Sequence, residues 1–218
     1  MTSWVPLASG RDADVFALDA HTVLRRYRHP VDSGPEAAAM AHVESHGFPV
    51  PGVHRAEGAE MEMDRLHGPT MLDACLNGDV APEEAAKTLA DLQGRLHALP
   101  PRSGRGPVLH MDLHPGNVVL TSGSPVVIDW TNALDGDPDL DLAVSALLLA
   151  MVADSGPSDL AAVAAAALPH YVRHAQGDPA RLVDDAVALR LRDPNLSHDE
   201  LSNLPKSADL VRRIQRNR

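Results

Sequence analysis

The first 66 residues alternate apolar and polar positions in the way that half-buried β-strands do. Between residues 3 and 28 the segments VPLASG, ADVFALD and TVLRRYR are separated by residues that favour turns. This pattern predicts two or three strands joined by tight turns. Segments 52–58 and 59–66 have the same character and predict a further hairpin. We therefore expect this part of the chain to be rich in β-sheet.

One helix is expected inside the β-rich part. Residues 33–47 read SGPEAAAMAHVESHG, in which Ser33 can cap the first turn, Pro35 lies within that turn, and Gly47 ends the segment. These residue types begin and end helices. The FPVP segment that follows is expected to be extended, because proline restricts the residue before it.

From Gly68 onward the periodicity is mainly helical. Residues 82–98 place three leucines at helical spacing, and helices are also predicted for 139–154, 157–175, 178–192 and from about 198. Residues 107–130 interrupt them with short apolar runs and a loop. We expect an α+β fold of two lobes, a β-rich lobe at residues 1–66 and a helical lobe at residues 67–218. Ligands usually bind in the cleft between such lobes.

The charge of the chain narrows the classes of partner. The 218 residues include 30 Asp and Glu against 19 Lys and Arg, which gives a formal net charge of −11. Nucleic-acid backbones are bound by clustered Lys and Arg, so no nucleic-acid partner is expected. An acidic cleft would favour cationic small molecules, although acidity that only aids solubility is an equally good interpretation.

Cysteine usage and hydropathy limit the redox and membrane chemistry. Cys75 is the single cysteine, so no intramolecular disulfide and no thiolate metal cluster can form. No basic region followed by an apolar run opens the chain, and the most apolar stretch, residues 142–153, is too short to span a bilayer. We expect a cytoplasmic protein with no membrane partner.

Residues 110–130 concentrate the side chains that can do chemistry. Asp112 and Asn117 lie in a loop between apolar runs, and Asp129 ends the next run. A hairpin would bring Asn117 beside Asp129. Phosphoryl transfer needs a carboxylate that orients and deprotonates the attacking hydroxyl, and hard oxygen ligands for Mg²⁺. The trio therefore predicts a base, Asp112, and a magnesium site made by Asn117 and Asp129.

This arrangement resembles the aminoglycoside phosphotransferase and choline kinase family, a relative of protein kinases. That family carries H-x-D-x-x-x-x-N, then a hairpin that ends in I-D-W or similar, then an acidic segment that ends in D-L-A. The matching segments here are HMDLHPGN, IDW and DLDLA. The resemblance implies the same roles for the trio and a protein-kinase-like fold. It also implies that Asp141 braces the catalytic loop and that His110 is structural.

The resemblance extends through the β-rich part and covers about residues 7–143. LASGRDADVFAL is similar to a degenerate glycine-rich loop, which implies that Ser9 and Gly10 lie at the turn near the phosphates. MEMDRLHGPTM is similar to the family's hinge between the lobes. Backbone groups from Asp64 to Leu66 are therefore expected to meet the adenine.

The strand TVLRRYR corresponds to the one that bears the family's phosphate-contacting lysine. Val23 and Arg25 are its expected nucleotide-binding residues, and Glu36 matches the glutamate that pairs with the cation. Arg25 replaces that lysine, which keeps the charge but changes the geometry, because a guanidinium is a larger planar fork. Met111 stands where the family usually has a small residue, often glycine. We expect its bulk to narrow or reshape the acceptor pocket beside the base.

Two neighbouring features have both a structural and a functional interpretation. His114 is expected either to support the site residues from behind or to contact the acceptor. Asp135, Asp137 and Asp139 form an acidic loop cluster that is either solvated or a site for a cationic acceptor.

Three functions are compatible with these residues. The first is a kinase that moves the γ-phosphate of ATP, or of GTP, to a hydroxyl of a small and possibly cationic molecule such as an aminoglycoside or amino alcohol. The second is a pseudokinase module that binds nucleotide with little catalysis, which the missing lysine and the degenerate glycine loop favour. The third is a metal-dependent hydrolase that uses His110, Asp112 and His114 as metal ligands. A Pro-Gly turn directly after His114 argues against the third function.

Overall fold

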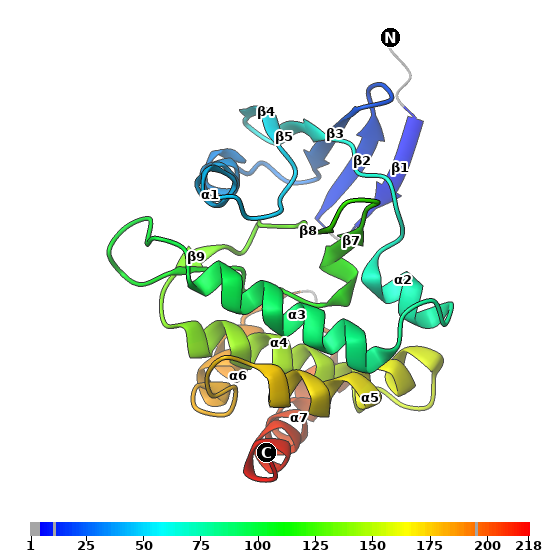
Figure 1. The fold of residues 1–218 in the computed structure, drawn as a ribbon, viewed down its shortest axis with the longest axis vertical. Helices are drawn as coiled ribbons and strands as arrows, with labels where there is room; N and C mark the ends of the chain where they lie inside the picture. The colour runs from blue at the N-terminus through cyan, green and yellow to red at the C-terminus, as the bar shows by residue number, and fades with distance from the viewer. Residues whose placement is uncertain (1–4, 11, 195) are drawn as a thin grey trace.

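The computed structural model describes residues 5–10, 12–194 and 196–218 and consists of a β-sheet part above a helical part (Figure 1). One antiparallel sheet has the strand order β1-β2-β3-β5-β4. Its strands are β1 (Val5–Ser9), β2 (Ala13–Ala17), β3 (Thr22–Tyr27), β4 (Val53–Glu57) and β5 (Glu60–Asp64). The strands and the hairpin predicted from the sequence are present, while residues 3 and 4 of the predicted first strand lie outside the described residues.

Strand β3 lies in the middle of this sheet. Its Arg25 stands between Val15 of β2 and Met61 of β5 in the antiparallel register. Alternation along the strand puts Val23, Arg25 and Tyr27 on one face. All three side chains are buried. The sheet therefore fixes the position of Arg25 from both sides.

Helix α1 (Gly34–Ser45) connects β3 to β4 and contains the predicted proline in its first turn. Ser33 directly precedes the helix, but its hydroxyl does not cap it. Ser33 has helical backbone angles (φ −74°, ψ −9°), whereas a capping residue usually has an extended backbone. Its hydroxyl instead donates to the Glu60 carbonyl at 3.0 Å and ties the start of α1 to β5.

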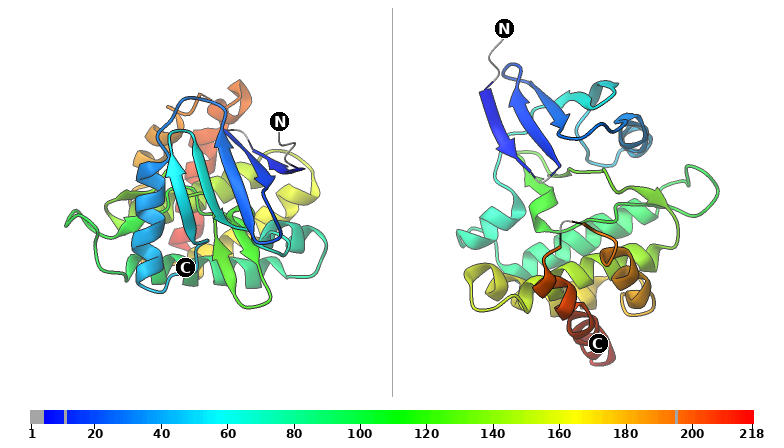
Figure 2. Two further views of the ribbon diagram at one scale, coloured as in Figure 1. Left: turned by 90° about the horizontal axis from the view of Figure 1, so that it is seen from above. Right: turned by 180° about the vertical axis from the view of Figure 1, so that it is seen from behind.

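Within the described residues, the helical part packs six α-helices beneath the sheet (Figure 2). They are α2 (Met71–Leu76), α3 (Pro82–His97), α4 (Pro138–Ala153), α5 (Asp159–His174), α6 (Val183–Arg190) and α7 (His198–Arg216). Helices α3, α4 and α5 share a buried polar network: Tyr171 donates to Gln93 Oε1, and Gln93 Nε2 donates to Ser145 Oγ at 3.2 Å. None of the described helices has the length and apolar character that a bilayer crossing requires.

The predicted helix 178–192 is shorter than expected. Helix α6 begins at Val183, because the preceding residues are held in a turn. The Asp178 N–H donates to Asp139 Oδ1 at 3.0 Å, and the Ala180 N–H donates to Asp178 Oδ1 at 2.9 Å. Contacts with α4 thus prevail over the local helical pattern.

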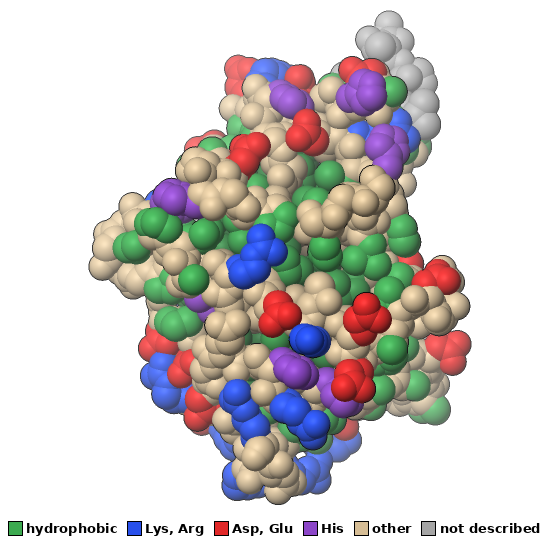
Figure 3. Space-filling model, in the orientation of Figure 1, with side chains coloured by type: hydrophobic (Ala, Val, Ile, Leu, Met, Phe, Trp, Pro, Cys, Tyr) green, Lys and Arg blue, Asp and Glu red, His purple; other side chains and the backbone are tan. Residues whose placement is uncertain are grey.

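In the described part of the chain, four short strands lie within residues 108–135, the segment that contains the predicted catalytic loop. Strand β6 (Val108–Leu109) pairs with β9 (Leu134–Asp135), and β7 (Val118–Leu120) pairs with β8 (Pro125–Val127). The predicted hairpin is present as β7 and β8. Trp130 is fully buried beside it, with its ring centroid 5.8 Å from that of Phe48. Hydrophobic side chains also gather at the waist of the face shown in Figure 3, between the sheet and the helices.

Candidate active site

A cleft of about 850 Å³ lies between the sheet and the helical part. Ten of the residues predicted to form the site line this cleft, and the remaining two, His110 and Asp141, are buried outside its lining. The ten are Ser9, Gly10, Val23, Arg25, Glu36, Asp64, Leu66, Asp112, Asn117 and Asp129. The fold therefore gathers residues from both halves of the chain at one place.

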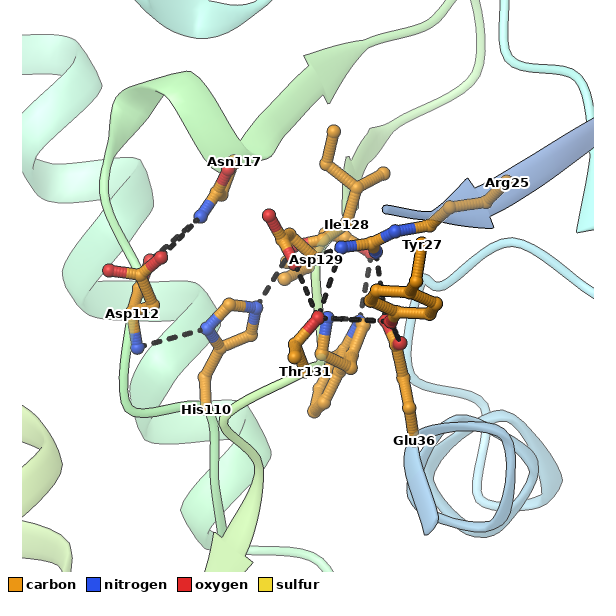
Figure 4. Close-up of polar contacts among 11 residues, drawn as sticks. Arg25, Tyr27, Glu36, His110, Asp112, Asn117, Ile128, Asp129 and Thr131 are labelled. Atoms are coloured by element: carbon orange, nitrogen blue, oxygen red, sulfur yellow. Dashed lines mark hydrogen bonds and ion pairs between the residues drawn. The ribbon is translucent and has the colours of Figure 1, made fainter. Parts of the chain in front are cut away.

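Arg25 bridges two carboxylates across the cleft (Figure 4). Its Nη1 donates to Glu36 Oε1 at 2.9 Å, and its Nη2 donates to Asp129 Oδ1 at 2.6 Å. Nη2 also donates to the Thr131 hydroxyl at 3.0 Å. The guanidinium makes this bridge from two separate nitrogens, whereas a lysine would have to reach both carboxylates from a single ammonium.

Glu36 is held by more partners than the sequence predicted. Its Oε1 accepts the Trp130 N–H at 3.1 Å, and its Oε2 accepts the Tyr27 hydroxyl. Burial raises the pKa of Glu36 to about 6, against the opposing effect of Arg25. Sequence reasoning missed both Tyr27 and Thr131. Their positions in the sequence could have indicated them, since Tyr27 lies two residues after Arg25 and Thr131 lies two residues after Asp129.

Asp129 has the left-handed backbone conformation, with φ of 65°. Its Oδ1 accepts from Arg25 and, at 2.9 Å, from the Thr131 hydroxyl. Burial alone would raise the pKa of Asp129, but Arg25 holds it below its usual value. Among the described residues no group donates to Oδ2, which leaves that oxygen available to a cation.

His110 orders the backbone around the predicted base. Its Nε2 donates to the Ile128 carbonyl at 3.0 Å, and its Nδ1 accepts the Asp112 N–H at 3.3 Å. Complete burial lowers its pKa, so the ring is neutral. Because both ring nitrogens have backbone partners, His110 is not available to the His110, Asp112 and His114 metal set that the hydrolase alternative requires. The described residues also contain no cluster of three His, Cys, Asp or Glu side chains suited to a metal ion.

Asp141 holds the same loop from α4. Its two oxygens accept the His110 N–H at 3.2 Å and the Met111 N–H at 2.7 Å, and His97 Nε2 bonds to it at 2.8 Å. Burial would raise the pKa of Asp141, but its hydrogen bond with His97 contributes to a net lowering. The carboxylate is therefore ionised inside the protein. His97, on α3, is a further residue that sequence reasoning missed.

Asp112 differs from its neighbours because it makes no ion pair within the described part of the chain. Asn117 Nδ2 donates to the Asp112 carbonyl at 2.9 Å and approaches the carboxylate Oδ2 at 3.4 Å. Burial raises the pKa of Asp112 to about 6, and the charge of Asp129 adds to the effect. The side chain is thus a stronger base than a free aspartate and lines the cleft.

Met111 does not narrow the cleft, contrary to the expectation from the sequence. Its side chain is 9% exposed, belongs to the hydrophobic core, and is not among the groups that line the cleft. Its φ of 64° places it in the left-handed region that glycine adopts most readily. The family's preference for a small residue at this position therefore matches a backbone requirement.

The acidic loop cluster is not a site for a cationic acceptor. Arg181 binds both Asp137 and Asp139, and Arg102 Nη2 lies 3.0 Å from Asp135 Oδ1. None of these acids lines the cleft. Their charges are balanced within the protein.

In the predicted phosphate loop and hinge, some of the polar groups already form hydrogen bonds within the protein. The Gly10 N–H donates to the Ala13 carbonyl at 2.9 Å, and the Ser9 hydroxyl donates to Asp14 Oδ1 at 2.7 Å. In the hinge the Asp64 N–H bonds to the Gly52 carbonyl at 2.9 Å. The next N–H, of residue 65, is also taken by a backbone carbonyl. Within the described residues, the Leu66 N–H donates to no backbone carbonyl. It is therefore the hinge N–H that remains available to the adenine ring of a nucleotide.

The oxygens of Asn117 and Asp129 suit a magnesium ion. Asn117 uses its Nδ2 toward Asp112, which leaves its amide oxygen available, and Asp129 offers its Oδ2. Mg²⁺ prefers hard oxygens and is usually held by one or two carboxylates together with substrate phosphates. The donor set therefore fits the ion.

Comparison with known proteins places this site in a family. The model of the phosphotransferase enzyme family matches residues 3–107 and 73–177. Thiamine kinase of Salmonella paratyphi B is 54% identical over 43 residues, which are 20% of this chain and 16% of that kinase. The chain thus matches only a small part of that relative's length.

Solved structures show the same fold at low identity. A putative aminoglycoside phosphotransferase from Ralstonia eutropha has a TM-score of 0.60 at 13% identity, over 99% of this chain and 92% of that one. Amicoumacin kinase hAmiN, in complex with AMP-PNP and Ca²⁺, has a TM-score of 0.56 at 12% identity, over 95% of this chain and 87% of that one. Both likenesses confirm the predicted two-lobed, protein-kinase-like α+β fold. On the family match, the chain belongs to the phosphotransferase enzyme family.

Proposed function

We propose that this chain is a small-molecule kinase that transfers the γ-phosphate of ATP, or of GTP, to an alcohol. One observation carries the proposal: Asp112, a half-buried carboxylate without an ion pair in the described residues, lines one cleft together with two oxygens that are available to a cation. Arg25 supplies a fixed positive charge to the same cleft. Membership of the phosphotransferase family supports this reaction class.

In the proposed reaction the alcohol oxygen bonds to the γ-phosphorus. The bond between that phosphorus and the β–γ bridging oxygen breaks, and the nucleoside diphosphate leaves. The hydroxyl proton passes to the Asp112 carboxylate. A pKa of about 6 leaves Asp112 mostly ionised at neutral pH while it binds a proton more readily than a free aspartate.

The surrounding residues position the base. The N–H groups of His110 and Met111 are both held by Asp141, and His110 in turn holds the Asp112 N–H. The backbone on either side of the base therefore has little freedom. Positioning of this kind supplies a large share of the rate in phosphoryl transfer, which asks for little covalent help.

Asn117 and Asp129 are the residues that would hold magnesium. When bound, the ion neutralises the negative charge of the nucleotide phosphates. Arg25 adds a fixed positive charge beside them, steadied by Glu36 at 2.9 Å.

A nucleotide-binding module with weak catalysis is the second candidate. The observation that favours it is the 2.6 Å contact between Arg25 and Asp129, because an arginine that binds a metal ligand competes with the metal. The two candidates agree on nucleotide binding and differ in turnover.

The test is the variant Asp112→Asn. We expect it to abolish phosphoryl transfer, measured as ADP release with a panel of alcohols, while magnesium–AMP-PNP affinity by calorimetry stays near that of the wild type. Asp129→Asn should weaken both. Asp91→Asn, at an exposed position of α3, is the control and should change neither. Wild-type turnover in Asp112→Asn would remove Asp112 as the base, and nucleotide binding without turnover on any alcohol would favour the second candidate.

A further inference from the structure

The cleft beyond the catalytic loop has aliphatic walls. It continues between α2, α4 and α5, where its lining includes Leu72, Leu148, Met151, Val152, Leu160 and Val163. This wall starts next to the loop, since a Cβ placed on Gly116 would lie 3.8 Å from Leu72 Cδ2. Apolar surface therefore adjoins the position of the base.

These aliphatic side chains are not fully covered by the protein. Leu160 is 39% exposed, and Leu148, Met151, Val152 and Val163 are half-buried. Aliphatic surface left open to water inside a concave site is a source of binding free energy for an apolar ligand. The wall therefore favours a ligand that removes it from water.

Apart from Asp112, the charged side chains at this end of the cleft already have polar partners. Arg190 Nη1 lies 3.1 Å from Asp193 Oδ2. Glu200 Oε2 accepts the Ser197 N–H at 2.8 Å and the Ser197 hydroxyl at 2.7 Å, in the capping box of α7. A polycationic acceptor needs several carboxylates for its ammonium groups, because a charge that leaves water unpaired is costly. Within the described lining of this end, Asp112 is the carboxylate without an ion pair, and its one side-chain partner is the neutral Asn117 amide at 3.4 Å.

We infer that the acceptor is an uncharged alcohol whose carbon skeleton is mostly apolar. Its hydroxyl lies at Asp112, and its skeleton lies against the aliphatic wall of α2, α4 and α5. This inference rests on the proposed function, because the reacting hydroxyl sets the position of the skeleton. The cleft volume of about 850 Å³ lies toward the upper end of the range of about 300–1,000 Å³ that ligand pockets span.

Three alcohols of equal chain length test the inference: 1-octanol, diethylene glycol monoethyl ether and 7-aminoheptan-1-ol. Binding is measured by calorimetry in the presence of magnesium–AMP-PNP, and turnover by phosphorylation of each alcohol with ATP. We expect 1-octanol to bind at least about tenfold more tightly than the other two, because each methylene buried adds to the hydrophobic free energy. The order of kcat/KM should be the same.

Two leucine variants locate the binding site. Leu160 and Leu76 are similarly exposed, at 39% and 42%, but only Leu160 lines the cleft. Leu160→Asp should lower 1-octanol affinity about tenfold with AMP-PNP affinity unchanged, whereas Leu76→Asp should lower neither. The new carboxylate lies in the first turn of α5, where the helix dipole tolerates it, so the variant should fold, as circular dichroism can check.

The outcomes separate this inference from the proposed function. If 7-aminoheptan-1-ol or the ether alcohol is phosphorylated better than 1-octanol, the inference is overturned and the kinase function stands. If 1-octanol binds with the expected dependence on Leu160 but none of the three alcohols is phosphorylated, the apolar site stands and the kinase function fails. If the wild type is a dimer, Leu160→Asp makes it monomeric and neither binds 1-octanol, a second copy occupies the wall and the inference is wrong.

Discussion

Asp112 and Asp129 show how surroundings separate two carboxylates in one cleft. Both are partly removed from water, which by itself raises the pKa of each. Asp129 has Arg25 at 2.6 Å and stays acidic, whereas Asp112 has no such contact and its pKa rises to about 6. Carboxylates whose pKa values diverge can take different roles. Asp129, which stays ionised, suits the role of a metal ligand, and Asp112 suits the role of a base.

The pH dependence of turnover follows from the pKa of Asp112. The ionised carboxylate is the form that accepts a proton, so turnover should rise with pH and level off above the pKa of about 6. The charge of Asp193 contributes to raising this pKa, so Asp193→Asn should move the acidic limb to lower pH. The measurement is kcat between about pH 5 and about pH 8. A profile that is flat across this range would contradict the assignment.

Arg25 also bears on stability. Arg25→Gln leaves the buried Glu36 without its 2.9 Å ion pair, and breaking a buried pair from one side costs about 3 kcal/mol. We expect a loss of that size in the free energy of unfolding, measured with urea. The neighbouring Arg26→Gln is the matched control, because Arg26 pairs with Glu60 near the surface and should cost less than about 1 kcal/mol. Equal losses in the two variants would show that the buried ion pair between Arg25 and Glu36 contributes no more to the free energy of unfolding than a surface pair does.

At the residue scale the sequence located the site through spacing. Asp112, Asn117 and Asp129 follow a local motif, and the structure brings them to one cleft. Sequence reasoning missed Tyr27, Thr131 and His97, because their hydrogen-bond partners lie far away along the chain. Tyr27 meets Thr131 across 104 residues, and His97 meets Asp141 across 44. No local pattern encodes such a pairing.

At the element scale the periodicity predicted most helices and strands. It failed where tertiary contacts decide the local conformation. Helix α6 begins late because Asp139 holds the turn before it, and β9 exists only because β6 pairs with it. Two-residue strands carry too few positions for an alternation to be recognised.

The packing of α3, α4 and α5 depends on a polar network that hydropathy does not reveal. Tyr171, Gln93 and Ser145 are all fully buried, and Tyr171 donates to Gln93. Tyr171→Phe leaves the Gln93 oxygen unsatisfied in the core and should cost about 1–3 kcal/mol of unfolding free energy. Ser155→Ala removes an exposed hydroxyl that bonds to Val152 and should cost far less. Unchanged urea midpoints for Tyr171→Phe would show that the network is dispensable.

At the scale of the whole molecule, one cluster joins the sheet to the helical part. Arg25, Tyr27 and Glu36 come from the sheet side, and Asp129 and Thr131 come from the segment that follows β8. Thr131 does not line the large cleft, yet its hydroxyl contacts Arg25, Asp129 and Tyr27. A substitution of Thr131 can therefore weaken the contacts between the sheet and the helical part without removing a side chain that lines the cleft.

Thr131→Val tests whether this join sets the geometry of the nucleotide site. Valine keeps the shape of threonine but loses all three polar contacts, so the unfolding free energy should fall by about 1–2 kcal/mol. A ligand that binds only the folded protein adds about 2.7 kcal/mol at a hundredfold excess over its Kd. If the join positions both parts, magnesium–AMP-PNP at a fixed concentration should raise the melting temperature of Thr131→Val less than that of the wild type. An equal rise in both proteins would mean that the nucleotide site forms without this join.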